Sequence, residues 1–291
     1  MGIAVSGGPD SVALLLLAHA AWPGMVEAAT VDHALRQESG DEAEWVARLC
    51  EPRGIPHHTA KVRLADGNVQ AEARHARYTA LAEWASSRRL SAVATAHHAD
   101  DQAETLIMRL NRGSGLSGLA GIRRSTRIPG SSFLLLRPLL SWRRAELSNI
   151  VRHAGIEPVN DPSNEDKRFD RVRVRNALRK TDWLDVASIA KSAGFLGDAA
   201  DFLNDIVERE WQRRAIVEAG RVSFDPRCHR YLQGALVARA VTHVSGREPR
   251  GGQVARLVGS LAHGGQANLG GVLATASDER WLFEAEPPRR G

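Results

Sequence analysis

The stretch GIAVSGGPDS at residues 2–11 reads as a short apolar strand that runs into a polar loop and then a helix. Two adjacent glycines, Gly7 and Gly8, let the backbone approach an oxyanion closely, and their amides can form an anion-binding nest. A helix that begins near Asp10 and Ser11 points the positive end of its dipole at the same anion. This order predicts a phosphate-binding loop at the head of an α/β domain. An ordinary strand-to-helix turn is the alternative, which the full pattern disfavours.

Hydroxyl groups and a carboxylate complete the predicted loop. Ser6 and Ser11 can donate hydrogen bonds to a phosphate, and Asp10 can cap the helix or help to hold Mg²⁺ that arrives with a nucleotide. The loop is not a Walker A motif, because the Gly-Lys-Ser/Thr ending is missing. No permanent metal is predicted. The predicted nucleotide-binding residues are Ser6, Gly7, Gly8, Pro9, Asp10 and Ser11.

The first half of the chain alternates short apolar runs with helical patterns. Strands are predicted at Ile3–Val5, Val26–Val31, Thr59–Val62, Ala92–Ala96 and Phe133–Leu136. Helices are predicted at Ser11–Ala21, Gly40–Arg53, Val69–Arg89 and Asp101–Arg112. Such alternation predicts a Rossmann-like parallel sheet with helices on both faces and ligands at the carboxyl ends of the strands.

After about residue 180 the pattern becomes mostly helical. Amphipathic helices are predicted twice within Ala187–Gly220, once at His229–Val244 and once at Gln253–His263, with a small hairpin from Gln266–Ala276 and Glu279–Glu284. We therefore predict a catalytic domain at residues 1–180 and a smaller, mostly helical domain at residues 181–291.

The composition is ordinary for a soluble globular protein, with 43% hydrophobic and 25% charged residues. A net charge of +5 fits either a polyanionic partner such as nucleic acid or simple solubility.

Cys50 and Cys228 are far apart, which indicates a reducing cytoplasm and argues against a zinc or iron–sulfur site. The longest apolar run, Val12–Ala21, is too short to span a bilayer, so no membrane contact is expected. The sequence does not indicate an oligomeric state.

A second polar cluster, HHADDQAET, follows the fourth predicted strand. Asp101 and Glu104 lie three residues apart, so a helix places both carboxylates on one face, where they can grip an ammonium group. His98 is a candidate general base near neutral pH, whereas His97 is expected to be structural and directed back into the sheet. Helix capping accounts for Asp100. A shared metal site is disfavoured, because adjacent histidines at a strand end point to opposite faces.

The segment KRFDRVRVRNALRK at residues 167–180 holds seven basic side chains and one acidic one. Its arginines recur at three- and four-residue steps, so a helix aligns most of them on one face that can neutralise phosphates. A solvated helix face is the alternative, and one arginine could instead stabilise charge on a nucleotide α-phosphate. The arginines predicted to contact nucleic acid are Arg168, Arg171, Arg173, Arg175 and Arg179.

SGGPDS is the signature of the PP-loop ATP pyrophosphatases, which cleave ATP between its α and β phosphates. Three further segments, in this order, resemble the tRNA(Ile)-lysidine synthetases of that group. They are VDHALR at 31–36, ATAHHADDQAET at 94–105, and DPSN at 161–164 followed by RVRVRN at 171–176. The resemblance is strong to about residue 180 and weaker at GGQANLGG in the tail. Family members usually carry residues before the first strand, which begins here at residue 2, so a shortened start is one interpretation.

The resemblance implies one reaction. ATP adenylates the C2 oxygen of the wobble cytidine in an isoleucine tRNA with the anticodon CAU, and the ε-amine of L-lysine then displaces AMP to leave lysidine. It also implies ATP and Mg²⁺ as cofactors and a second domain that contacts the tRNA. Asp101 and Glu104 are expected to bind lysine, and His33 to lie beside the nucleotide or to replace His98 as the base. The expected catalytic residues are Asp101, Glu104, His98 and Arg175.

Three alternatives remain open. A PP-loop tRNA thiolase would need catalytic or cluster-binding cysteines, which two isolated cysteines do not supply. A small-molecule adenylating ligase of the NAD or GMP synthetase kind would not require the arginine run. A tRNA-binding protein with a vestigial loop would not need Asp101 and Glu104. The G-x-G-x-x-G match at 113–118 follows a helix and not a strand, so we interpret it as a flexible loop beside the active site.

Overall fold

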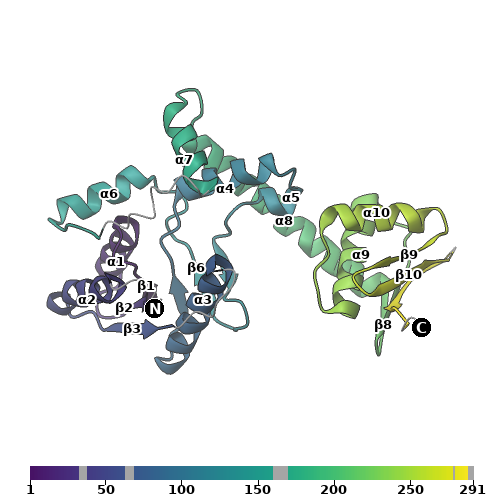
Figure 1. Cartoon of the computed structure of the whole chain (residues 1–291), viewed down its shortest axis with the longest axis horizontal. Coiled ribbons are helices and arrows are strands. Elements are labelled where there is room, and N and C mark those ends of the chain that lie inside the picture. Colours follow the sequence, from purple (N-terminus) through teal and green to yellow (C-terminus); the bar gives the residue numbers. More distant parts are fainter. Residues whose placement is uncertain (33–37, 63–68, 160–169, 278, 288–291) are drawn as a thin grey trace. The chain divides into compact units, whose positions relative to one another are not determined.

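The computed structural model of the chain describes residues 1–32, 38–62, 69–159, 170–277 and 279–287. The chain forms two compact units, Met1–Gly197 and Asp198–Gly291 (Figure 1). The division falls inside the helix α8 (Val186–Arg214), which contributes residues to both units.

A six-stranded sheet forms the centre of the first unit. Its strands are β1 (Gly2–Ala4), β2 (Glu27–Asp32), β3 (His57–Lys61), β4 (Ala92–Ala94), β5 (Ser125–Arg127) and β6 (Leu134–Leu136). They lie in the order β3-β2-β1-β4-β6-β5, with β5 antiparallel to β6 and the other neighbours parallel. The order reverses between β1 and β4, so the segments that leave the carboxyl ends of these strands diverge and open a crevice. The predicted Rossmann-like fold class is confirmed.

Helices cover both faces of this sheet. The helices described in the first unit before α8 are α1 (Pro9–Ala21), α2 (Glu38–Cys50), α3 (Val69–Ser87), α4 (Ala99–Asn111), α5 (Leu116–Leu119), α6 (Arg144–His153) and α7 (Asp170–Lys180). Because successive strand residues point to opposite faces, Ala28 joins a core with α1, α2 and α6, whereas Ala29 joins a core with Leu81 and Trp84 of α3. The two cores fix β1 and β4 and thereby the crevice between them.

The start of β1 leaves no room for a side chain. A Cβ atom added to Gly2 would lie 2.6 Å from Cζ3 and 2.7 Å from Cη2 of Trp84, which is itself buried. We expect Gly2→Ala to lower the free energy of unfolding by about 1–3 kcal/mol through overpacking. Gly194→Ala is the control, since a Cβ atom there meets nothing within 4 Å in α8. Urea unfolding of both variants tests this, and an equal effect of the two substitutions would contradict it.

The second unit combines helices with an antiparallel sheet. Its helices besides α8 are α9 (Arg230–Ser245) and α10 (Gly251–Ala262). Its strands are β7 (Ala215–Glu218), β8 (Arg221–Phe224), β9 (Gln266–Leu269), β10 (Val272–Ala276) and β11 (Trp281–Ala285), in the order β7-β8-β11-β10-β9. Apolar residues of α9 and α10 pack on Phe224 and Phe283, whose rings stack at 5.6 Å.

Two details of the predicted tail are wrong. Residues 187–220 form one helix and a strand, not two helices, because AIVE at 215–218 pairs with β8 instead of continuing α8. The predicted hairpin forms between β10 and β11, but its first arm, predicted as Gln266–Ala276, is two strands, β9 and β10. The hairpin also belongs to a five-stranded sheet, since β11 pairs with β8. Strands of four or five residues carry too little periodicity to be separated from helix ends by sequence alone.

Candidate active site

Serine hydroxyls fix the loop between β1 and α1. The Ser6 amide donates to Ser11 Oγ at 3.1 Å, and Ser11 Oγ donates to the Gly8 carbonyl at 2.9 Å. Gly7 adopts φ +83°, a conformation that side chains disfavour, and its carbonyl accepts a hydrogen bond from the Val159 amide at 3.0 Å. The loop is therefore held in one shape before any anion binds.

The Asp10 carboxylate is left available by this loop. Gly8, and not Asp10, is the N-cap of α1. Asp10 Oδ2 lies 3.4 Å from His98 Nε2 and 4.0 Å from Arg144 Nε, while Oδ1 is buried and has no hydrogen-bond partner among the described residues. A buried acceptor without a partner costs free energy until a ligand or cation satisfies it. One carboxylate oxygen together with nucleotide phosphates is a donor set that suits Mg²⁺.

His98 caps α4 from the end of β4. Its Nδ1 accepts the Asp101 amide at 3.3 Å, and Asp101 Oδ2 accepts the His98 amide at 3.0 Å, so the two residues form a reciprocal capping box. The side chain is only 4% exposed. Burial alone lowers the pKa of His98, but the hydrogen bond to Asp10 and the charges of Asp101, Asp10 and Asp100 together raise it above the ordinary value.

Asp100 caps a different helix from the one predicted. Its Oδ2 accepts the Arg144 amide at 2.8 Å, and its carboxylate accepts Arg143 Nε and Nη2 at 3.2 and 3.3 Å. The prediction that Asp100 caps its own helix is therefore wrong, because the carboxylate turns to the unsatisfied amides at the start of α6. Burial raises the pKa of Asp100, but the bonds from Arg143 and Arg144 bring it below its usual range.

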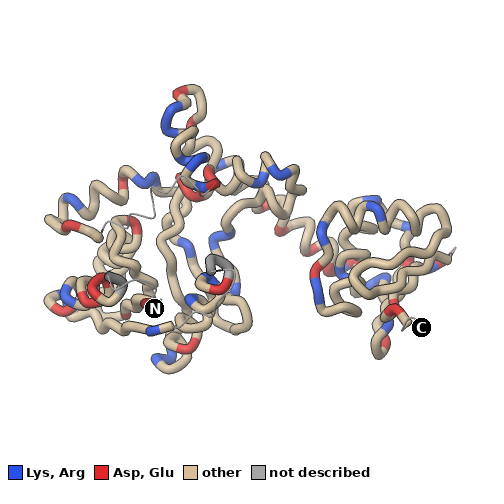
Figure 2. The backbone as a smooth tube through the Cα atoms, in the orientation of Figure 1, with Lys and Arg blue, Asp and Glu red and all other residues tan. Residues whose placement is uncertain are grey.

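Glu104 joins α4 to α7. The carboxylate is 2% exposed and accepts Arg171 Nε at 2.8 Å and Arg175 Nε at 2.6 Å. Arg171 Nη2 also lies 3.3 Å from Asp101 Oδ1. In Figure 2, basic and acidic segments of the tube adjoin where Figure 1 places α4 and α7. Both Glu104 oxygens are thus occupied by guanidinium groups.

Among the remaining arginines of the basic run, Arg173 lies apart from this cluster, whereas Arg179 lines a small cavity with Glu104 and Arg175. Arg173 is 72% exposed and contacts Asp170 at 3.5 Å, while Arg179 is exposed at the end of α7. Arg168 and His33 lie outside the described residues. The run therefore divides by helix face, with Arg171 and Arg175 directed at α4 and Arg173 at solvent.

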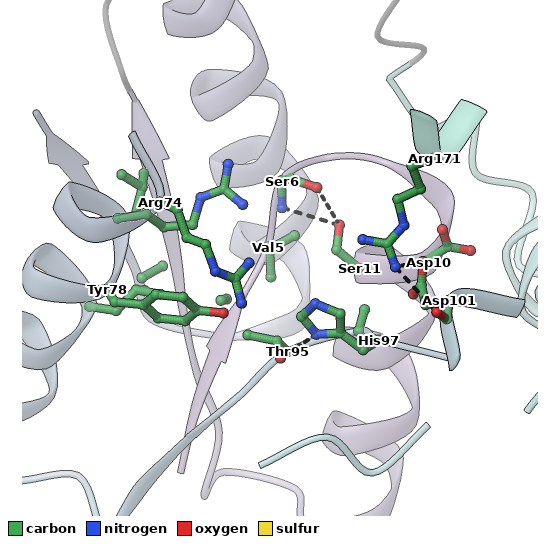
Figure 3. Close-up of a pocket in the computed structure, with 16 residues that line it drawn as sticks. Val5, Ser6, Asp10, Ser11, Arg74, Tyr78, Thr95, His97, Asp101 and Arg171 are labelled. Atoms are coloured by element: carbon green, nitrogen blue, oxygen red, sulfur yellow. Dashed lines mark hydrogen bonds and ion pairs between the residues drawn. The ribbon is translucent and has the colours of Figure 1, made fainter. Parts of the chain in front are cut away.

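A cavity of about 270 Å³, here named the strand cavity, opens between the carboxyl ends of the strands and α3. Its apolar wall includes Val5, Ala29 and Val31. Arg74 stacks over the Tyr78 ring at 4.9 Å on one side, and Figure 3 shows Ser6, Ser11, Asp101 and Arg171 on the other. A planar apolar group fits the wall, and an attached anion fits the loop.

His97 faces the strand cavity. Its Nδ1 lies 3.0 Å from Thr95 Oγ1, and the ring points toward the loop (Figure 3). The expectation that His97 points back into the sheet is therefore wrong, since the chain turns away from the sheet after β4 ends at Ala94. Burial lowers the pKa of His97 to about 4, although Asp101 opposes the shift, so the ring is neutral at pH 7.

The lowered pKa of His97 predicts a pH dependence of stability. Between pH 6.5 and about 4 the unfolded chain binds a proton that native His97 does not, so stability falls as the pH is lowered through this window. The free energy of unfolding of wild type minus that of His97→Gln, measured with urea, should be highest above pH 6.5 and should fall toward pH 4. A value that stays constant or rises on acidification would contradict the assignment.

A second cavity of about 300 Å³, here named the loop cavity, lies on the outer side of the phosphate loop. Ser6, Asp10, Ser11, Asp101 and Arg171 line both cavities. The residues that line the loop cavity but not the strand cavity are Gly8, Pro9, His98, Arg144 and Arg175. One ligand can therefore extend from the apolar wall past the loop to a cluster of three guanidinium groups.

Residues 1–181 match the PP-loop domain family. A tRNA(Ile)-lysidine synthase from Novosphingobium aromaticivorans is 49% identical over 291 residues, which cover 99% of this chain and 89% of that protein. The chain belongs to the tRNA(Ile)-lysidine synthase family. A second member, from Zymomonas mobilis, is 40% identical over 100% of this chain and 89% of its own length.

A solved structure shares the fold of this family member. The U34-tRNA thiolase NcsA from Methanococcus maripaludis, solved with its [4Fe-4S] cluster, superposes with a TM-score of 0.56 at 18% identity, covering 68% of this chain and 72% of that one. This likeness concerns the fold alone. The described residues contain no group of three His, Cys, Asp or Glu residues that could hold a metal ion. Burial raises the pKa of the Cys50 thiol to about 11, which makes it unreactive.

The structure of this family member unites most of the predicted site residues. The loop residues 6–11, His98, Asp101, Glu104, Arg171 and Arg175 surround the two cavities or support them. Sequence reasoning missed Arg74, Tyr78 and Arg144, although the spacing of Arg74 and Tyr78 (i, i+4) on a predicted helix was a usable signal. No described helix has the length and apolar character needed to cross a membrane.

Proposed function

We propose that this chain converts the wobble cytidine of an isoleucine tRNA with the anticodon CAU into lysidine, using ATP and L-lysine. The observation that carries the proposal is the meeting of the two cavities at the phosphate loop, where Asp101 and Arg171 line both. Membership of the tRNA(Ile)-lysidine synthase family supports the substrate. A tRNA substrate and unpaired thiols fit a reaction in the cytoplasm.

The first step is adenylation. Adenosine fits the strand cavity, with the neutral His97 and Arg74 beside it, and the α-phosphate then lies at the loop near Ser6 and Ser11. The C2 oxygen of cytidine attacks the α-phosphorus, and the bond to the bridging oxygen breaks with its electron pair leaving on pyrophosphate. Arg171 lies where it can stabilise the charge that develops on the α-phosphate. Mg²⁺, held by Asp10 and the phosphates, would neutralise the leaving group.

Lysine attacks in the second step. Its neutral ε-amine bonds to C2 of the adenylated cytidine, the C2–O bond breaks, and AMP leaves with the bonding pair. Asp101 borders both cavities and is the carboxylate best placed to hold the ammonium and to accept its proton. Glu104 remains a proposed lysine ligand, but its contacts give it a further role, because it fixes Arg171 and Arg175 from α4.

The contacts of His98 favour a positioning role over the role of general base. Its Nδ1 accepts a backbone amide, which places the proton on Nε2, and that nitrogen faces Asp10. A ring whose two nitrogens are both engaged has no free lone pair for the lysine ammonium. We propose that His98 orients Asp10 and the first turn of α4.

Exposed arginines of α7 fit contact with the tRNA backbone, and we propose the second unit as a further contact surface. Arg173→Gln should weaken tRNA binding a few-fold and lower the slope of log K against log salt by about 1, because one phosphate contact is lost. Arg48→Gln is the control, since Arg48 is exposed and paired within α2 as Arg173 is within α7. Filter binding at several salt concentrations measures both, and an unchanged slope for Arg173→Gln would contradict the contact.

Release of AMP separates this function from its alternatives. We expect AMP formation from ATP to require both L-lysine and the isoleucine tRNA, and to stop when the wobble cytidine is replaced by uridine. AMP formation without tRNA would indicate a small-molecule ligase. A dependence on tRNA and a sulfur donor, but not on lysine, would indicate a thiolase.

A further inference from the structure

The start of α6 is tied to the start of α4. Asp100 accepts the Arg144 amide and the Arg143 guanidinium, and the Ala99 amide donates to the Trp142 carbonyl at 2.8 Å. Two helix N-termini are thereby held together beside the phosphate loop. Arg144 is the first residue of α6, so the same contacts fix where its side chain begins.

The Arg144 side chain reaches the phosphate loop. Its Nε lies 4.0 Å from Asp10 Oδ2, and the side chain is 29% exposed. It lines the loop cavity and a smaller cavity of about 110 Å³ bounded by Asp100, Glu104 and Arg175. It does not line the strand cavity, where adenosine fits, whereas Arg171 lines both. Arg144 therefore faces the side of the loop away from the adenosine wall.

Of the three guanidinium groups at the loop cavity, Arg144 makes the weakest ion pairs with the described residues. Arg171 and Arg175 each donate to Glu104 at 2.8 Å or less. In the part of the chain that the structure describes, the ion pair at 4.0 Å with Asp10 is the closest that Arg144 makes. A guanidinium that has no closer ion pair among the described residues, beside a loop of anion-binding amides, favours a polyphosphate ligand.

We propose that Arg144 is a further catalytic residue, which binds the β- and γ-phosphates of ATP and stabilises the departing pyrophosphate. The inference rests on the proposed adenylation. When the bond between the α-phosphorus and the bridging oxygen breaks, the electron pair stays on that oxygen and pyrophosphate gains one negative charge. A planar guanidinium can donate two parallel hydrogen bonds to such an anion and accepts no proton.

Binding measurements with the full chain test the role of Arg144. Arg144→Gln should weaken the binding of pyrophosphate and of ATP with Mg²⁺ by about ten- to a hundred-fold, the effect of losing a charged hydrogen-bond donor. The affinity of Arg144→Gln for AMP, which lacks both outer phosphates, should lie within about twofold of the wild-type affinity. The affinity of Arg144→Lys for ATP and pyrophosphate should lie between those of wild type and Arg144→Gln, since lysine keeps the positive charge but not the two parallel donors of a guanidinium. Arg152→Gln is the matched control, because Arg152 lies in the last turn of the same helix and contacts only Asn149 among the described residues.

The outcomes are distinct. The proposal would be overturned if Arg144→Gln lost affinity for AMP, ATP and pyrophosphate equally, or if its affinity for pyrophosphate were unchanged. If Arg144→Gln fails to fold, the same comparison of pyrophosphate with AMP in Arg144→Lys decides it. A wild-type chain that binds ATP and pyrophosphate but forms no lysidine would refute the proposed function, while the result for Arg144 would stand.

Discussion

Glu104→Gln is expected to reduce lysidine formation by about 10²- to 10⁴-fold, because the substitution releases two arginines from their positions at the active site. Glu104 is 2% exposed and accepts a hydrogen bond from both Arg171 and Arg175. A glutamine of the same size keeps the packing but offers one acceptor oxygen and no charge. Arg175 then loses its carboxylate partner, and Arg171 keeps only its contact with Asp101. Both side chains lose their fixed orientation toward the α-phosphate.

The same substitution should also lower stability. Breaking a buried ion pair from one side costs about 3–5 kcal/mol, and the lower value is expected here because Arg171 is 40% exposed and can regain water. Steady-state kinetics and urea unfolding measure the two effects, with Glu44→Gln as the control at an exposed ion pair. Activity above about a third of wild type at unchanged stability would contradict a central role for Glu104.

Asp10→Asn is expected to reduce kcat by about 10²- to 10³-fold and to raise the Mg²⁺ concentration needed for half-maximal activity. The reason is the buried Asp10 Oδ1, which has no hydrogen-bond partner among the described residues and lies at the cavity that receives the phosphates. Asparagine preserves the shape but removes the charge that a divalent cation requires. It also removes the anionic partner of His98 Nε2.

Activity assays over a series of Mg²⁺ concentrations test this prediction. Asp41→Asn is the control, because Asp41 is an exposed carboxylate near the start of α2. A loss of activity with an unchanged Mg²⁺ dependence would show that Asp10 acts through His98 alone. Unchanged activity would remove Asp10 from the site altogether.

The parts of the site that the sequence predicts are those whose residues are close along the chain. The loop at 6–11 and the segment from His97 to Glu104 each carry a strand end, a turn and a helix start within about ten residues, so local pattern is sufficient. The two segments lie close together because the strand order reverses between β1 and β4. Alternation of strands and helices predicts a parallel sheet but does not give the order of its strands.

The parts that the sequence does not predict are brought in by tertiary structure. Arg144 follows no motif and reaches the loop because Asp100, 44 positions earlier, binds its amide. His97 turns into the strand cavity because β4 ends three residues before it, and strand boundaries are the weakest element of a sequence prediction. Arg171 and Arg175 are separated from Arg173 by the register of α7 against α4. Contacts of the two arginines with Glu104 and of Arg171 with Asp101 fix this register.

Incorporation of radiolabelled L-lysine into an isoleucine tRNA transcript with the anticodon CAU, in the presence of ATP and Mg²⁺, tests the central claim most directly. We expect label in the tRNA with the wild-type chain, none when the wobble cytidine is replaced by uridine, and a near-complete loss with Asp101→Asn. Absence of label with a wild-type chain that binds both ATP and the tRNA would contradict the account.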